Sequence, residues 1–370
     1  MRIPLARPDI TRTEVDAVLK VLSQDVLSRG PVLQRFEQCV ARRLGVGHAV
    51  GLSSGTAALH LSMVAVGVEP GDEVITVPFT VPATVNAILA SGARPVLVDV
   101  EAQTRGMDPE RLEQAITPAT RAVVVVHAFG QPAAMARIER ICRSRDLVLV
   151  EDACEGLGSS HQGRALGSIG RTGCFGFYPN KQITTGEGGI LVTSDSDLAE
   201  RVRRLANHGR SMDGAWLDQQ EVGWNYRMSE VQAALGVSQM QRLDGILEAR
   251  RQVAAWYAEL WPESVPLKLP AYWPDPEIAW FALVAQLADP ADRDGLIACL
   301  ADRGIQCGRY FAPMHRQPAM ARFGWKHDDF PVCNQLADSA LALPFFTTMT
   351  RAQVAEVCRA LADWRAANPV

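Results

Sequence analysis

The sequence contains no long uninterrupted apolar run. None of its 370 residues lies in an apolar stretch of about 18 residues, the length that crosses a bilayer. The first residues, "MRIPLARPDITRTEVDAVL", also lack the apolar core of a secretory signal. We therefore expect a protein without a membrane span, working in the cytoplasm.

Paired cysteines are absent as well, because no two of the eight cysteines form a Cys-x-x-Cys motif. Widely dispersed cysteines predict free thiols in a reducing compartment and argue against a structural zinc site. The seven histidines show no metal-ligand spacing, so we expect no metal. The cysteines are Cys39, Cys142, Cys154, Cys174, Cys299, Cys307, Cys333 and Cys358.

The chain also lacks an excess of charge of one sign. Its net charge of −4 leaves no basic footprint for nucleic acid. The stretch "GLGSSH" at residues 156–161 lacks the third glycine of the dinucleotide-binding motif. What remains is an ordinary globular composition, 48% hydrophobic and 21% charged, on a chain long enough for two domains.

Strand-like runs alternate with helical patterns from residue 48 to residue 152. The runs "RAVVVVHAFG" and "LVLVEDA" are nearly all apolar, as expected for strands buried on both faces. Alternation of this kind predicts an α/β fold with a mostly parallel sheet flanked by helices.

The pattern changes in the second half of the chain. "CFGFY" and "GGILVTS" predict two further strands, and residues 228–261 predict one long helix. Beyond residue 275 the sequence predicts a strand in "IAWFALVAQL", a helix in "DRDGLIACLADRG", a strand in "IQCGRYF" and two closing helices. We therefore expect a large domain over residues 1–245 and a small α+β domain over residues 246–370.

Two stretches fall where an open parallel sheet binds ligands, at the carboxyl ends of its strands. In "GLSSGTAAL" a strand passes through small residues into a helix start, where Gly55 allows close approach and Thr56 offers a hydroxyl and an amide. Such a helix start suits a phosphate, although a plain helix cap explains it equally well. Asp152 ends an apolar strand, so its carboxylate needs a cationic ligand or a structural partner.

A single lysine, Lys181, stands in "GFYPNKQITTGEGG" between a strand-like run and a glycine-rich turn, with few charged neighbours. A lysine withdrawn from water is a nucleophile and base, and lysine forms Schiff bases with pyridoxal phosphate. That cofactor also needs a phosphate site and a carboxylate at its pyridine nitrogen. The sequence supplies Gly55 with Thr56, then Asp152, then Lys181, and this combination is more specific than any one part.

The chain resembles the DegT/DnrJ/StrS sugar aminotransferases, which are fold-type I pyridoxal-phosphate enzymes, over nearly its whole length. The resemblance rests on "SSGTAALHLSM", "VITVPFTVPATVNAI", "VEDACEGLGSS", "NKQITTGEGG", "GWNYRMSEVQAALG" and "YFAPMH". It implies a homodimer that acts on a nucleotide-linked keto sugar, with glutamate as the amino donor.

The resemblance also implies a role for each site residue. Lys181 would bind the cofactor covalently and move the proton, and Asp152 would pair with the pyridine nitrogen. Glu155 would lie near the phenolic oxygen, and Asn225 would reach the phosphate in the neighbouring subunit, so that the active site is shared. The implied cofactor residues are Ser54, Gly55, Thr56, Val81, Asp152, Glu155, Gly176, Lys181 and Asn225, and the implied substrate residues are Arg227, Tyr310 and His315.

The chain departs from the family pattern at three places. Val81 stands where many members stack an aromatic ring on the cofactor, and Gly176 stands where many have a serine at the phosphate. The segment "AWFALV" lacks histidines that often precede this strand. The stretch "ITTGEGG" resembles the corresponding stretch of members that aminate C-4 of a 4-keto-6-deoxy sugar, such as perosamine synthases. The alternative substrate is a 3-keto sugar or a cyclitol.

A different class of enzyme is suggested by "GLSSG", Gly51 to Gly55, which matches the Gly-x-Ser-x-Gly nucleophile elbow of serine hydrolases. Ser53 would then be the nucleophile, with His315 or His208 as its base. This hypothesis leaves "NKQITTGEGG" unexplained. Dehydratases within the same family carry histidine in place of the lysine, so Lys181 favours transamination.

Overall fold

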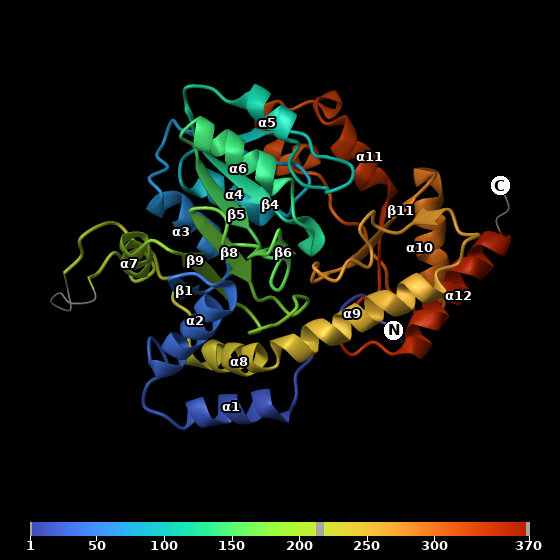
Figure 1. The fold of residues 1–370 in the computed structure, drawn as a ribbon, viewed down its shortest axis with the longest axis horizontal. Helices are drawn as coiled ribbons and strands as arrows, with labels where there is room; N and C mark the ends of the chain where they lie inside the picture. Colours follow the sequence, from blue (N-terminus) through green and yellow to red (C-terminus); the bar gives the residue numbers. More distant parts are fainter. Residues whose placement is uncertain (1, 212–217, 368–370) are drawn as a thin grey trace.

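A seven-stranded sheet forms the centre of the protein in the computed structural model, which describes residues 2–211 and 218–367 (Figure 1). β9 is antiparallel to both of its neighbours, and the remaining adjacent strands pair in parallel. The predicted α/β fold with a mostly parallel sheet is therefore confirmed. In spatial order the strands are β1 (His48–Leu52), β9 (Gly189–Thr193), β8 (Thr172–Gly176), β5 (Val148–Asp152), β4 (Thr120–Val126), β2 (Glu73–Thr76) and β3 (Arg94–Leu97).

The apolar side chains of β4 contribute to the hydrophobic cores on both faces of this sheet. Successive side chains of a strand point to opposite faces, so Val123 and Val125 enter one core while Ala122 and Val124 enter the other. Helices cover both faces, as a parallel sheet requires. The first core includes residues of α6 (Met135–Ser144), and the second includes residues of α3 (Gly55–Ala65), α4 (Pro82–Ala90) and α7 (Ser196–Leu205).

The helix predicted over residues 228–261 is two helices, which is a correction. α8 (Glu230–Gln241) ends where the amide of Arg242 bonds to the carbonyl of Gln239, three residues back, and α9 (Leu243–Leu260) begins directly afterwards. The Arg242 guanidinium binds Asp9 at 2.5 Å and Glu14 at 2.9 Å. These contacts join the break to α1 (Arg12–Leu22), which packs on α8 together with α2 (Pro31–Leu44).

The C-terminal part contains a three-stranded antiparallel sheet of β10 (Leu267–Lys268), β11 (Leu283–Leu287) and β12 (Ala340–Leu343). This part also contains the α-helices α10 (Arg293–Asp302), α11 (Pro331–Ser339) and α12 (Arg351–Ala367), and α5 (Pro109–Ala115) lies in the first half of the chain. The strand predicted in "IQCGRYF" is wrong, because this segment forms only two isolated bridges, Ile305 with Ile3 and Gly308 with Ala342.

The start of the chain packs into the C-terminal core, where Ile3 lies among residues of α9 and α12. Figure 1 accordingly places the N-terminus beside α9 and α12. A domain boundary near residue 245 stays a proposal; it falls at the start of α9. Among the described residues no helix combines the length and the apolar character needed to cross a bilayer.

Candidate active site

The carboxylate of Asp152 lies at the carboxyl end of β5 and is only 4% exposed. It accepts hydrogen bonds from the Thr84 hydroxyl at 2.7 Å and from the Cys154 amide at 3.2 Å. Thr84 stands on α4, and its hydroxyl lies 2.9 Å from that of Thr80. A buried anion needs such partners, so α4 and the turn after β5 hold this carboxylate in a defined place.

Lys181 approaches the same region from the loop between β8 and β9. Its Nζ lies 3.2 Å from Glu155 Oε1 and 4.2 Å from the centroid of the Phe281 ring. The side chain of Lys181 is 14% exposed, so this amine is largely withdrawn from water.

Glu155 lies between Lys181 and a set of stacked aromatic rings, those of Phe129, Tyr310 and Phe281. Its Oε2 accepts the Phe129 amide at 2.8 Å, and burial raises the pKa of the Glu155 carboxyl although Lys181 and that amide oppose the rise. The ring of Tyr310 stacks on Phe129 at 6.2 Å and on Phe281 at 6.4 Å. Burial, with the nearby Glu155 charge, raises the pKa of Tyr310. The structure thus brings Tyr310 to the Lys181–Glu155 pair.

The start of α3 offers free amides. Ser54 caps the helix by accepting the Ala57 amide at 3.0 Å, whereas the Gly55 and Thr56 amides have no acceptor within the described residues. A Cβ at Gly55 would lie 3.0 Å from Cys154 Sγ and 3.1 Å from Gly176 Cα, so a larger residue would require these neighbours to shift by a few tenths of an ångström. Two free amides at a helix N-terminus suit a phosphate group.

These groups together fit pyridoxal phosphate. The cofactor needs an anion site for its phosphate, a carboxylate for its ring nitrogen and a lysine for its aldehyde. Gly55 with Thr56, Asp152 and Lys181 are the groups that would meet these three needs, and they follow the carboxyl ends of β1, β5 and β8. In the described part of the chain no cluster of three or more histidine, cysteine, aspartate or glutamate residues could hold a metal ion.

Asn225 and Arg227 lie in a surface segment beside β1. Asn225 is exposed and bridges to Asn207, while the Arg227 guanidinium donates to Asn207 Oδ1 at 3.0 Å. Burial, and then the charges of Arg29 and Arg210, lower the pKa of Arg227. The structure brings this pair together on the surface, and their action on a second subunit stays a prediction.

The model of the DegT/DnrJ/EryC1/StrS aminotransferase family matches residues 8–362 of this chain. The chain belongs to this family. It is 36% identical to the spore coat polysaccharide biosynthesis protein SpsC of Bacillus subtilis, with 98% of this chain and 96% of that protein covered. It is also 36% identical to the GDP-perosamine synthase of Caulobacter vibrioides, with 97% of each covered.

Solved structures agree with this membership. The Spr1654 protein of Streptococcus pneumoniae, in its PLP (pyridoxal phosphate) form, superposes with a TM-score of 0.94 at 26% identity and 99% coverage of both chains. The predictions of a sugar aminotransferase and of a fold-type I architecture are therefore confirmed.

The hydrolase hypothesis is wrong for this aminotransferase. The amide of Ser53 donates to the Tyr226 carbonyl at 2.8 Å. Across the described ranges no hydrogen bond joins the Ser53 hydroxyl to His315 or His208, and His315 Nε2 instead lies 2.9 Å from Asn334 Oδ1. The sequence "GLSSG" instead leads into the cap of α3 at Ser54.

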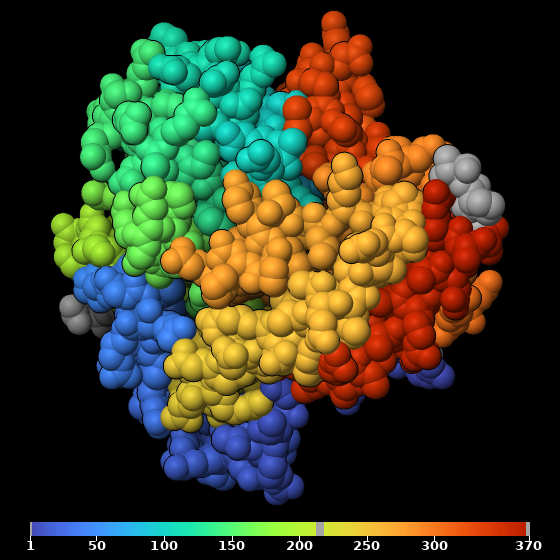
Figure 2. Space-filling model, turned by 45° about the vertical axis from the view of Figure 1, so that its right-hand side comes forward, coloured from blue at the N-terminus to red at the C-terminus, as the bar shows by residue number. Residues whose placement is uncertain are grey.

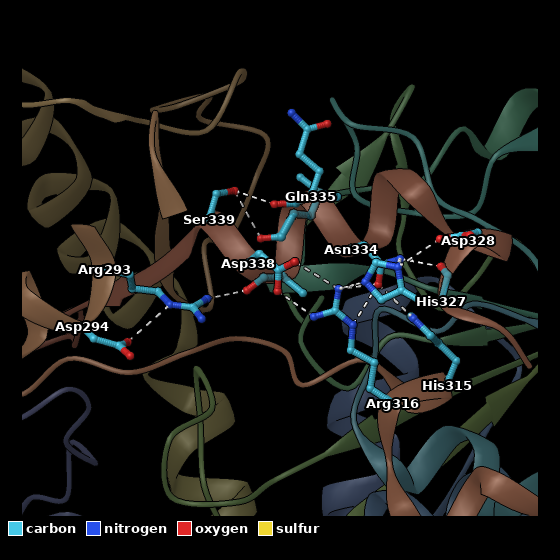
Figure 3. A network of polar contacts seen from close by, with 12 residues as sticks. Arg293, Asp294, His315, Arg316, His327, Asp328, Asn334, Gln335, Asp338 and Ser339 are labelled. Atoms are coloured by element: carbon cyan, nitrogen blue, oxygen red, sulfur yellow. Dashed lines mark hydrogen bonds and ion pairs between the residues drawn. The ribbon is translucent and has the colours of Figure 1, made fainter. Parts of the chain in front are cut away.

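His315 occupies a network of polar contacts at α11 (Figure 3). Its Nε2 lies 2.9 Å from Asn334 Oδ1, and Arg316 donates to the same oxygen and to both oxygens of Asp338. His315 is buried, and burial lowers its pKa although the bond to Asn334 opposes this. These contacts attach the segment after Tyr310 to α11; a direct contact of His315 with substrate stays a prediction.

Two of the three departures from the family pattern, Val81 and Gly176, differ in their surroundings. Val81 directly precedes α4 and is 38% exposed, one turn before Thr84. A Cβ at Gly176 would lie 3.6 Å from Cys154 Sγ, which is an ordinary contact, so this position tolerates a side chain.

Sequence patterns did not predict three residues that shape this site. Thr84 lies in an ordinary helical run, Phe281 precedes a strand, and Gln182 donates to the carbonyls of Glu155 and Ala279 at 2.6 and 2.8 Å. Their roles depend on contacts between distant segments. Of the three, Gln182 had the clearest signal in the sequence, because it is a polar residue directly after Lys181.

Proposed function

We propose that this enzyme transfers an amino group from glutamate to C-4 of a nucleotide-linked 4-keto-6-deoxy sugar, using pyridoxal phosphate bound to Lys181. The observation that carries this proposal is the position of the Lys181 amine, 3.2 Å from Glu155 in a largely buried site. The similarity to a GDP-perosamine synthase at 36% identity supports this class of substrate.

Each residue of the site has a task that suits transamination. Bound pyridoxal phosphate supplies an electron sink for the carbon that gains or loses the amino group. Asp152 would keep a proton on the ring nitrogen, because its buried carboxylate lacks a cationic partner among the described residues. Lys181 would take the proton from the substrate carbon and return it, and the Gly55 and Thr56 amides would bind the phosphate.

A homodimer with shared active sites is part of the proposal. Asn225 is exposed to receive a neighbour, and the nearby Arg227 adds positive charge for an anionic cofactor or substrate. The outer side of α1 exposes Val15, Leu19 and Leu22 at 42%, 54% and 56%, which suits burial against a second chain. The eight cysteines are free, which supports a cytoplasmic location.

A panel of keto-sugar nucleotides tests this function. The purified enzyme, supplied with pyridoxal phosphate and glutamate, should aminate 4-keto-6-deoxy sugars, and mass spectrometry of the product should show the amino sugar. The variant Lys181→Ala serves as the control without the reacting amine. Exclusive amination of 3-keto sugars or cyclitols would refute the assignment to C-4, and no transfer to any substrate would refute the proposal as a whole.

A further inference from the structure

The segment that carries Phe281 is tied to the large sheet domain by its backbone. The Ala279 amide donates to Ser159 Oγ at 2.9 Å, and the Ala279 carbonyl accepts Gln182 Nε2 at 2.8 Å. The Phe281 amide donates to the Phe129 carbonyl at 3.0 Å. In the space-filling view, the orange atoms that precede β11 lie between the green and cyan atoms of the large domain and the gold atoms of α9 (Figure 2).

Arg250 on α9 binds the same segment from the other side. Its Nε and Nη2 donate to the Trp280 carbonyl at 3.1 and 2.9 Å, and Nη2 also donates to the Phe281 carbonyl at 2.7 Å. The guanidinium lies 4.8 Å from the centroid of the Phe345 ring, and Arg250 is only 3% exposed. A planar guanidinium that bonds two carbonyls and stacks on a ring fixes the segment in a way that lysine does not reproduce.

The result of this anchoring is a defined position for the Phe281 ring. The ring centroid lies 4.2 Å from Lys181 Nζ, well inside the range of a cation–π contact, and Glu155 lies 3.2 Å from the same nitrogen. Both partners stabilise the lysine amine while it is not bonded to a cofactor. That state also occurs during turnover, because an amino donor must displace Lys181 before its own nitrogen is transferred.

We propose that Phe281 and Glu155 form a resting site for the Lys181 amine when it is released from the cofactor, and that Arg250 is the positioning residue for Phe281. This inference rests on the proposed role of Lys181. A resting site that favours the released amine weakens cofactor binding and speeds displacement of Lys181 by the amino donor, because it stabilises only one of the two states.

Phe281→Leu tests the resting site, because leucine keeps an apolar side chain but lacks the ring. We expect the dissociation constant for pyridoxal phosphate, measured by absorbance titration, to fall about five- to thirtyfold, the range that corresponds to a largely desolvated cation–π contact. The single-turnover conversion of bound cofactor by glutamate should slow by a similar factor. Phe281→Tyr keeps the ring and should resemble the wild type. Merely structural damage would weaken cofactor binding instead.

Arg250→Lys tests the positioning role. This variant should shift both measurements in the same direction as Phe281→Leu, and should add no further shift in the Phe281→Leu background. Arg293→Lys is the matched control, because Arg293 also donates to a carbonyl, that of Ala337 at 2.6 Å, within the C-terminal part. It should lower the melting temperature without changing the dissociation constant for the cofactor.

The outcomes separate this inference from the proposed function. If wild-type protein binds pyridoxal phosphate in a Lys181-dependent manner but Phe281→Leu binds it with equal or lower affinity, the resting site is refuted alone. If Lys181→Ala binds the cofactor with the wild-type spectrum, the proposed role of Lys181 fails and the resting site fails with it.

Discussion

At the scale of single residues, the Thr84 hydroxyl makes the shorter of the two hydrogen bonds to the Asp152 carboxylate. Thr84 Oγ1 donates to Asp152 Oδ2 at 2.7 Å, and both groups are buried. Removing a donor from a buried carboxylate costs about 1–3 kcal/mol, and the carboxylate then faces the cofactor less precisely. If Asp152 has its proposed role, Thr84 would contribute to catalysis through Asp152 rather than by contact with the substrate.

Thr84→Val should lower kcat/KM by about 5- to 160-fold, which corresponds to this loss of free energy. Thr84→Ser retains the hydroxyl and serves as the control. Steady-state kinetics of both variants, with cofactor content checked by absorbance, measure the effect. Equal activity of the valine and serine variants would contradict a role for this hydrogen bond.

The sequence predicts those site residues whose position depends on local structure, such as a strand end or a turn. Lys181, Asp152 and Gly55 stand at strand ends and turns, and the alternation of strands and helices indicates such places. Thr84 and Phe281 act across distant segments, so only the folded chain shows their contacts.

At the scale of elements, the start of α3 and the end of β8 form the proposed phosphate site. A Cβ at Gly55 would lie 3.1 Å from the Cα of Gly176, whereas a Cβ at Gly176 would meet only ordinary contacts. The two glycines should therefore respond differently to substitution.

Gly55→Ala should weaken the binding of pyridoxal phosphate, because the added methyl group pushes the helix start away from β8. Gly176→Ser should fold normally and bind the cofactor at least as tightly as the wild type, because its hydroxyl can reach the phosphate. Absorbance titration measures both constants, with circular dichroism as the control for folding. Tighter binding by Gly55→Ala, or a loss of binding by Gly176→Ser, would contradict this geometry.

The anchoring of α1 on α8 should depend on pH. Burial alone would raise the pKa of Glu14, but hydrogen bonds from Thr11, Gln239 and Arg242 lower it to about 2. Because the pKa is lower in the folded state, the stabilisation is present above about 4.5 and is lost as the pH falls toward about 2.

Glu14→Gln should therefore lower the melting temperature at pH 7, and the difference from the wild type should shrink as the pH falls below about 4.5. Thermal unfolding at several pH values measures this, with Asp16→Asn as the control on the exposed side of α1. A difference that does not change with pH would contradict the role of the carboxylate charge.

The elements themselves were largely predicted from sequence, because alternating strand and helix patterns identify a parallel sheet. The break at Arg242 was not, since it depends on contacts with Asp9 and Glu14, far away in the chain. The segment "IQCGRYF" has strand-like composition but pairs only at Ile305 and Gly308, so tertiary packing overrides its local preference.

At the scale of the whole molecule, shared active sites require a specific pattern of complementation. Lys181→Ala and Asn225→Ala should each be inactive or clearly impaired. When the two proteins exchange subunits, one site of each mixed dimer has both defects and the other has none. Activity should then recover to about a quarter of the wild type if exchange is statistical. No recovery despite demonstrated exchange would show that Asn225 serves its own subunit.

The central claim is that Lys181 carries the cofactor, and the lysines of this chain allow a direct measurement. The others are Lys20, Lys268 and Lys326, which are all exposed, whereas Lys181 is largely buried in the site. Borohydride reduction of the protein loaded with pyridoxal phosphate, followed by peptide mass spectrometry, locates the cofactor. The account predicts the added mass on the peptide that contains Lys181. Added mass on any other lysine instead, or none at all on loaded protein, would contradict it.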